Sequence, residues 1–242
     1  ETIFDTLNCK AMIDAALTMM KKHGVELPVM ISLTVSDLAG RTLSGQTVDA
    51  FLASLSPYPI FSVGMNCAFG APQMKPFIEH MAQVAPYYIS AHPNAGLPNE
   101  MGEYDETAES MAPQIAEFID EGIVNIIGGC CGTSPEFIAH YARIAEGKKP
   151  HQVVEKPKYM WLSGLDLLQV DDSVHLPVDA SRFVNVGERC NVAGSRKFLR
   201  LINEKNYEEA IGIARKQVAD GAAVVDVNMD DGLLDAKAEM VN

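Results

Sequence analysis

Short apolar segments alternate with amphipathic segments along the first 145 residues, and this alternation constrains the fold more than any other feature of the sequence. Because the connections are short, each predicted strand reaches the next one through a helix, which makes the strands parallel. The predicted strands cover residues 1–5, 28–35, 60–66, 87–91 and a run that begins at 123, and the predicted helices cover residues 9–22, 47–55, 73–84, 107–121 and 135–145. Met12, Ala15, Ala16 and Met19 recur at helical spacing in the first helix, and Ile138, Tyr141, Ala142 and Ala145 are expected to face inward in the last.

Strand–helix units of this kind build either a doubly wound α/β sheet or a (β/α)8 barrel of the TIM type. Chemically capable residues follow four of the predicted strands, namely Asp5, Cys67, the loop 92–94 and the pair Cys130–Cys131. A barrel gathers its strand ends at one mouth, whereas an open sheet spreads them out, so the barrel is favoured. Since five units cannot close a barrel of eight strands, we expect residues 1–146 to be the C-terminal five units, with further strands upstream.

The alternation stops after residue 146 and resumes near residue 182. Residues 147–181 contain three prolines and little periodicity, so we expect an interdomain linker there. Beyond it, strands are predicted at 183–187 and 222–228, with a loop at 188–191 and a helix at 207–220. We therefore expect residues 182–242 to form the first βα units of a second barrel.

The net charge of −13 limits the possible partners. An acidic chain repels phosphate backbones, so no nucleic-acid partner is expected. No apolar run reaches the roughly 18 residues of a membrane helix, and no signal segment opens the sequence, so we expect no membrane partner and a cytoplasmic location. Five cysteines, an odd number, favour metal binding or catalysis over a disulfide framework.

The sequence Gly128-Gly-Cys-Cys-Gly-Thr133 puts two thiols at the carboxyl end of a predicted strand, where ligands bind in α/β folds. If the strands share a barrel mouth, Cys67 meets Cys130 and Cys131 there. Three thiolates bind Zn²⁺ and leave the fourth tetrahedral position open, which is the catalytic pattern. Such a site suits a soft ligand such as a substrate thiol, and indicates thiol alkylation rather than hydrolysis.

The alternative interpretation is that these cysteines are ordinary core residues, because an isolated cysteine is more often buried than bound to a metal. We interpret Cys9, on a predicted helix, as a core residue and Cys190, in a predicted loop, as an incidental thiol. The spacing of the cysteines alone does not decide between a zinc site and core packing.

Three motifs resemble the homocysteine-binding barrel of zinc-dependent homocysteine methyltransferases: Met65-Asn-Cys67, His92-Pro-Asn-Ala-Gly96 and Gly128-Gly-Cys-Cys-Gly-Thr133. The segments Phe183-Val-Asn-Val-Gly-Glu-Arg189 and Asp226-Val-Asn-Met-Asp230 narrow the likeness to the cobalamin-dependent methionine synthases. The resemblance covers essentially the whole chain.

This resemblance implies a methyltransferase reaction in which homocysteine accepts a methyl group from methylcobalamin and becomes methionine. Cys67, Cys130 and Cys131 match the zinc ligands. Glu1 is implied in binding the amino group of the substrate, and Asn94 in supplying an oxygen near zinc when substrate is absent. A cobalamin-binding module outside this chain would hold the cofactor, which 5-methyltetrahydrofolate recharges.

The second domain is similar to a pterin-binding barrel, and the resemblance implies pterin contacts from Glu188, Asn191, Asp226 and Asn228. Loop capping and turn formation are the alternative roles of such residues. Cys190 stands where the family usually has threonine, so no role is expected for it.

Two other functions fit the sequence. One is a zinc-thiolate methyltransferase that uses another methyl donor, such as betaine, although residues 183–242 argue against it. The other is a non-catalytic binding fragment, because two incomplete barrels leave open sheet edges and exposed apolar faces. In either case we expect the isolated fragment not to complete the full reaction.

Overall fold

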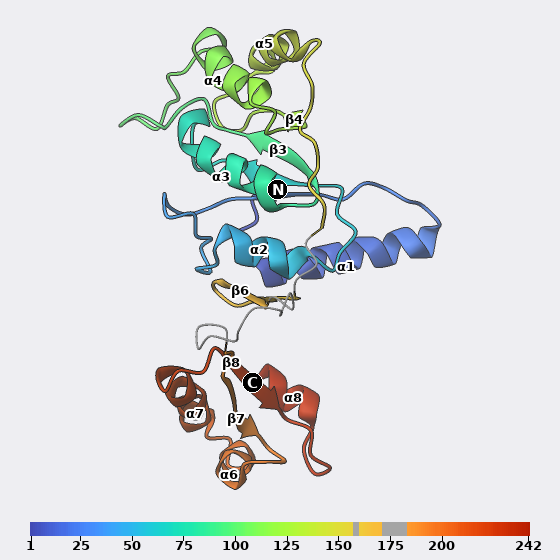
Figure 1. Ribbon diagram of the computed structural model, residues 1–242, viewed down its shortest axis with the longest axis vertical. Coiled ribbons are helices and arrows are strands. Elements are labelled where there is room, and N and C mark those ends of the chain that lie inside the picture. Colours follow the sequence, from blue (N-terminus) through green and yellow to red (C-terminus); the bar gives the residue numbers. More distant parts are fainter. Residues whose placement is uncertain (157–159, 171–182) are drawn as a thin grey trace. The chain divides into compact units, whose positions relative to one another are not determined.

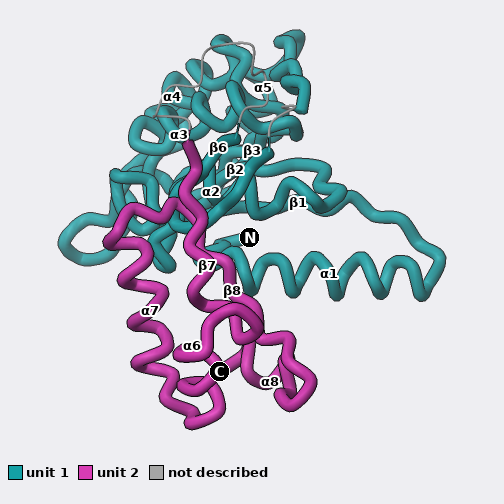
Figure 2. Tube along the Cα trace, turned by 60° about the horizontal axis from the view of Figure 1, so that its bottom comes forward, with its two compact units in different colours: residues 1–172 teal, residues 173–242 magenta. Residues whose placement is uncertain are grey.

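The computed structural model of the chain describes residues 1–156, 160–170 and 183–242. The chain divides into two compact units, residues 1–172 and residues 173–242, which are coloured separately in Figure 2. The parts of the expected linker at 157–159 and 171–181, and residue 182, lie outside the described residues.

The first unit contains a parallel sheet whose strands follow one another in chain order (Figure 1). Its strands are β1 (Met30–Leu33), β2 (Ser62–Asn66), β3 (Tyr88–His92) and β4 (Ile126–Ile127). Ile3 forms an isolated parallel bridge with Leu33, so the N-terminal segment runs beside β1. Sequential parallel order is typical of βα barrels, but the described residues form no closed barrel. The α/β class with a parallel sheet is confirmed.

The first unit has five helices, whose bounds lie close to the predicted ranges. They are α1 (Thr6–His23), α2 (Val48–Leu55), α3 (Ala71–Val84), α4 (Ala108–Asp120) and α5 (Pro135–Ala145). Side chains of Asp5, Thr47 and Thr107 accept hydrogen bonds from the first turns of α1, α2 and α4. These caps satisfy backbone donors that have no partner inside the helix, and the starts at Thr47 and Thr107 were predicted, whereas α1 begins three residues before its predicted start.

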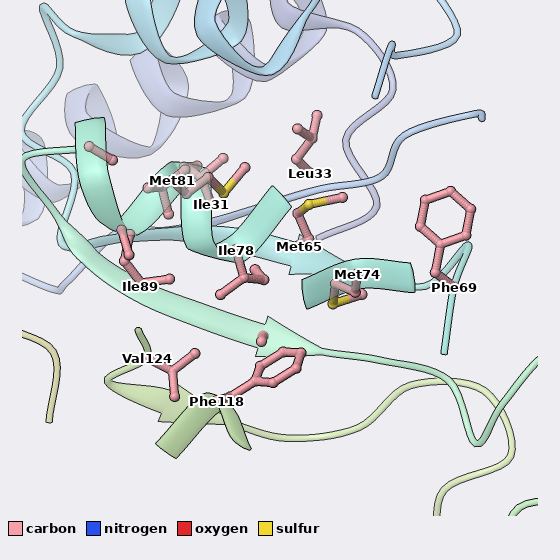
Figure 3. Close-up of a cluster of buried hydrophobic side chains, with 14 of the residues drawn as sticks. Ile31, Leu33, Met65, Phe69, Met74, Ile78, Met81, Ile89, Phe118 and Val124 are labelled. Carbon is pink, nitrogen blue, oxygen red and sulfur yellow. The ribbon is translucent and has the colours of Figure 1, made fainter. Parts of the chain in front are cut away.

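The core lies between the sheet and the helices, and strand β2 is buried at every position. Figure 3 shows Met65 of β2 in one cluster with Leu33 of β1 and with Met74 and Ile78 of α3. A strand covered on both faces lacks charged residues, and β2 has none. Position 64 requires glycine because a Cβ there would lie 1.8 Å from the Ser90 carbonyl oxygen.

The predicted inward face of α5 is wrong except at Tyr141, and the residues at helical spacing in α1 are not the ones that pack. In α1, Met12, Ala15, Ala16 and Met19 are all exposed, and Cys9 and Ile13 are buried instead. In α5, Tyr141 is buried as expected, but Ile138, Ala142 and Ala145 are exposed. Both helices carry apolar residues on more than one side, and α1 extends beyond the sheet (Figure 1). The periodicity of such a helix therefore does not decide which side packs.

Part of the expected linker is ordered and belongs to the first unit. Strands β5 (Met160–Ser163) and β6 (Leu167–Val170) form an antiparallel hairpin that packs on α2. The backbone N–H of Thr47 donates to the Leu165 carbonyl at 2.9 Å, and the Gln46 amide donates to the Gly164 carbonyl at 2.9 Å. The hairpin turn thus bonds to the residues that begin α2.

The second unit pairs β7 (Val186–Asn191) with β8 (Val224–Asn228) in parallel. Its helices are α6 (Arg196–Asn203), α7 (Tyr207–Ala219) and α8 (Ala236–Val241). Residues 188–191, predicted as a loop, continue strand β7 after a register shift between Gly187 and Cys190. Helix α6 was not predicted, although Ser195 caps it. Across the described ranges, no helix has the length and apolar character needed to cross a membrane.

Candidate metal centre

Three cysteine sulfurs meet at the carboxyl ends of β2 and β4. Cys67 follows β2, and Cys130 and Cys131 follow β4. The Sγ atoms of Cys67 and Cys131 are 3.4 Å apart, and all three Sγ atoms lie within 4.8 Å of one another. Residues separated by more than sixty positions are thus close together, because β2 and β4 flank β3 in the sheet.

The segment that follows β3 joins the two cysteine loops. The Cys67 N–H donates to the His92 carbonyl at 3.1 Å, and the Cys130 N–H donates to the Pro93 carbonyl at 2.9 Å. The Cys131 N–H donates to the side-chain oxygen of Asn94 at 3.2 Å. Residues 92–94 therefore hold both loops in place through backbone and side-chain hydrogen bonds.

The backbone around the sulfurs is strained. Cys67 has φ 61° and Ala68 has φ 62°, so two successive residues with a Cβ adopt the left-handed region. Each such residue costs roughly 1–2 kcal/mol relative to the right-handed region. Conformations of this kind persist where the surrounding structure enforces them, and they cluster at functional sites.

Glycines next to Cys130 and Cys131 allow neighbouring side chains to come close to the backbone. A Cβ at Gly128 would lie 2.3 Å from the ring of His92, and one at Gly132 would lie 2.5 Å from Tyr104. Gly132 also has φ 81°, which favours glycine. The glycines of the Gly-Gly-Cys-Cys-Gly sequence therefore let His92 and Tyr104 approach the cysteine loop.

The contact between the Cys67 and Cys131 thiols shifts the pKa of both. Burial, followed by hydrogen bonds with Cys131 and Cys130, raises the pKa of Cys67 to about 11. The hydrogen bond from Cys67 lowers the pKa of Cys131 more than burial raises it, and Tyr104 adds a further hydrogen bond. The same contact raises the pKa of Tyr104. Like charges in contact resist joint ionisation, so the pKa values of the Cys67 and Cys131 thiols are shifted in opposite directions.

The donor set fits Zn²⁺. Tetrahedral zinc binds thiolates at about 2.3 Å, which puts the sulfurs about 3.8 Å apart. The Cys67 and Cys131 sulfurs are 3.4 Å apart, and all three sulfurs lie within 4.8 Å of one another, which is close to this spacing. Within the described ranges, no histidine, carboxylate or further cysteine adds a fourth ligand to the group. Three sulfurs with one free position is the arrangement of a catalytic zinc site.

Two residues expected to bind substrate or metal lie at this site. Asn94 is 3% exposed, and its side-chain oxygen accepts from the Cys131 backbone, so it shapes the loop next to the sulfurs. Glu1 is exposed, and its charge acts on His92, opposing the burial that lowers the pKa of His92. Glu1 precedes Thr2, whose N–H donates to the Asn66 side chain at 2.9 Å, so the start of the chain runs beside the end of β2.

The sequence did not indicate two other residues at the site. Asn66 is 3% exposed and donates to the Cys130 sulfur at 3.9 Å. A buried asparagine at the end of an otherwise apolar strand was the available signal. Tyr104 lies in the loop between β3 and α4, and nothing in its sequence surroundings distinguishes it.

A second group of potential ligands brings Glu109, Glu136 and His140 within 4.8 Å of one another. Glu109 and Glu136 lie in the first turns of α4 and α5. Carboxylates are stabilised at helix starts by the helix dipole, which accounts for their positions without a ligand.

In the second unit, the predicted pterin-binding residues have different surroundings. Asn191 and Asn228 are register partners at the carboxyl ends of β7 and β8. The Asn191 side chain accepts from the Ala193 N–H at 2.9 Å, and the Asn228 side chain accepts from the Asp230 N–H at 2.8 Å, so both form turns. Glu188 and Asp226 are exposed.

Comparison with known proteins gives two family matches and a structural likeness. Residues 1–145 match the family described as homocysteine S-methyltransferase, and residues 187–242 match the family described as pterin binding enzyme. The crystal structure of the homocysteine methyltransferase MmuM from Escherichia coli, in its metallated form, is 21% identical with a TM-score of 0.39. The match covers 54% of this chain and 40% of that protein, so the chain spans about two fifths of its length.

Proposed function

Because the chain belongs to the homocysteine S-methyltransferase family, we propose that it is part of an enzyme that transfers a methyl group to the sulfur of homocysteine. The observation that carries this proposal is the group of three cysteine sulfurs at the ends of β2 and β4. The match of residues 187–242 to pterin binding enzymes supports a folate-type methyl donor.

Cys67, Cys130 and Cys131 are proposed to hold zinc. When bound there, zinc would supply a Lewis-acidic position that lowers the pKa of a substrate thiol while leaving its sulfur nucleophilic. The three cysteines carry enough negative charge to keep that position weakly acidic toward water, which favours sulfur as the ligand.

The remaining residues of the site position the substrate. Glu1 is proposed to bind the α-amino group, because the adjacent Thr2 bonds to Asn66, which in turn donates to the Cys130 sulfur. Asn94, through the Cys131 backbone, and Tyr104, through the Cys131 sulfur, keep the cysteine loop in one geometry.

In the reaction the substrate sulfur loses its proton and bonds to the methyl carbon. The bond between that carbon and the donor breaks, and its electron pair stays with the donor.

We further propose that the donor is methylcobalamin and that the whole protein is a cobalamin-dependent methionine synthase. The support is the order of the two family matches along one chain, homocysteine domain first and pterin domain second. Glu188, Asn191, Asp226 and Asn228 are the proposed contacts of 5-methyltetrahydrofolate. Cobalamin itself is assigned to a further module of the whole protein and to no residue here.

The alternative is a non-catalytic binding fragment. Exposed apolar residues on α1 and α5, such as Met12 and Ile138, favour it for the isolated chain. Zinc binding and homocysteine binding by the purified protein distinguish the two, because a structural fragment requires neither.

The direct test is metal analysis after exhaustive removal of loose metal. We expect about one zinc per chain in the wild type and a marked loss in Cys131→Ser. Cys190→Ala is the matched control, because it removes a buried thiol that lies outside the cluster. Equal zinc in the wild type and Cys131→Ser would refute the ligand assignment.

A further inference from the structure

Asn66 connects three separate parts of the first unit through one buried carboxamide. Its side-chain oxygen accepts from the Thr2 N–H at 2.9 Å and from the Ser32 hydroxyl at 2.6 Å. Its amide nitrogen donates to the Thr2 hydroxyl at 2.9 Å and to the Cys130 sulfur at 3.9 Å. An asparagine side chain has two donors and two acceptor sites, so its hydrogen-bonding capacity is fully used.

The two bonds to Thr2 form a clamp on an unusual backbone. Thr2 has φ 59°, which is a rare conformation for a β-branched residue. Ile3, the next residue, is bridged to Leu33, and its N–H donates to the Ser32 carbonyl at 3.0 Å. These two bonds therefore fix the backbone of Thr2, and with it the position of Glu1 relative to the edge of β1.

The fourth bond of Asn66 reaches the sulfur cluster, so one side chain contacts both the Glu1–Thr2 segment and a cysteine of the candidate metal centre. The Thr34 hydroxyl donates to the Asn66 carbonyl at 2.9 Å and holds its backbone from β1's side. Burial of Asn66, which is 3% exposed, limits the access of water to its carboxamide.

We propose that Asn66 is a positioning residue that sets the separation between the Glu1 carboxylate and the cysteine sulfurs. This inference rests on the proposed function, in which the substrate thiol binds at the sulfurs and its amino group binds at Glu1. A fixed separation selects thiols that carry an amino group at the distance found in homocysteine. Asn66 thus determines specificity without contacting the substrate.

The test compares two thiols of the same carbon chain, homocysteine and 4-mercaptobutanoate, which lacks the amino group. The protein is loaded with Co²⁺, and thiol binding is followed by the sulfur-to-cobalt charge-transfer absorption. We expect the wild type to prefer homocysteine by about tenfold or more, as a charge-assisted hydrogen bond allows. In Asn66→Ala we expect that preference to fall below about threefold while the affinity for 4-mercaptobutanoate stays nearly unchanged.

Two further variants distinguish a positioning effect of Asn66 from misfolding of the Asn66→Ala protein. Thr2 is exposed, so Thr2→Gly removes the clamped hydroxyl without disturbing the core, and should also reduce the preference. Ser32→Ala removes one hydrogen bond to the same Asn66 oxygen but leaves both bonds to Thr2. This variant should retain the preference for homocysteine.

An unchanged preference in both Asn66→Ala and Thr2→Gly would overturn the inference, as would an equal loss of affinity for both thiols, which indicates only a structural role. Failure of the wild type to bind either Co²⁺ or homocysteine would instead refute the proposed function, and the inference with it.

Discussion

Replacing Gly128 by alanine tests whether the loops around the cysteines are as tightly packed as the structure indicates. The new Cβ would lie 2.3 Å from Cδ2 and 2.8 Å from Nε2 of the His92 ring, whereas carbon atoms in contact are normally about 3.5–4.0 Å apart. Gly128 is buried, so the ring has to move, and His92 lies at the end of β3.

The consequences follow from what residues 92 and 93 hold. Their carbonyl groups accept the N–H groups of Cys67 and Cys130, so movement of His92 displaces both cysteine loops. Overpacking of this kind costs about 1–3 kcal/mol of unfolding free energy. Disturbing the groups that orient metal ligands typically weakens metal binding about 10–100-fold, and we expect a loss in this range.

Urea unfolding and zinc competition against a chromophoric chelator measure the two effects. Gly164→Ala is the matched control in the same unit, because a Cβ there meets nothing closer than 4.0 Å. It should change the unfolding free energy by no more than about 0.5 kcal/mol and leave zinc affinity unchanged. Wild-type stability and zinc affinity in Gly128→Ala would refute the packing argument.

Three further predictions follow from the same residues. Ala68→Gly should raise the unfolding free energy by about 1 kcal/mol in urea titrations, because glycine tolerates φ 62°; a loss of stability would contradict the strain at this position. Zinc affinity should rise with pH between about 6.5 and 8.5, since the pKa of Cys67 is raised to about 11 and binding must release its proton; chelator competition that gives a pH-independent affinity would contradict this. The hydrogen bond to Asp49 raises the pKa of His80, so this pair stabilises the fold below about pH 6.5, and the contribution, less than about 1 kcal/mol for a partly exposed pair, is lost as pH rises through the raised pKa. Asp49→Asn should remove this pH dependence from the unfolding free energy, and its persistence would indicate another group.

The parallel α/β arrangement was predictable because the signals for its strands and helices are local, although the described residues form no closed barrel. Helix starts at Thr47 and Thr107 have capping side chains, and strand β2 reads as an apolar run that ends at Cys67. Once the strands are known to be parallel and sequential, the residues that follow them must gather at one edge. The proximity of Cys67 to Cys130 and Cys131 follows from this topology.

The features that were not predicted depend on contacts between distant residues. Asn66 bonds to Thr2, Ser32 and Cys130, and no sequence pattern relates these positions. The packed side of α1 is set by its neighbours rather than by its own periodicity, since apolar residues occur around the helix. The hairpin at 160–170 is stabilised by α2, more than a hundred residues earlier, so its residues read as a linker by themselves.

The central claim is that three cysteine sulfurs hold one metal ion and leave one position for a substrate thiol. X-ray absorption at the zinc edge tests it most directly, because the spectrum counts the sulfur atoms around the ion. We expect three sulfurs at about 2.3 Å in the zinc-loaded protein and four after homocysteine is added. Fewer than three sulfurs, or a spectrum that homocysteine leaves unchanged, would contradict the claim.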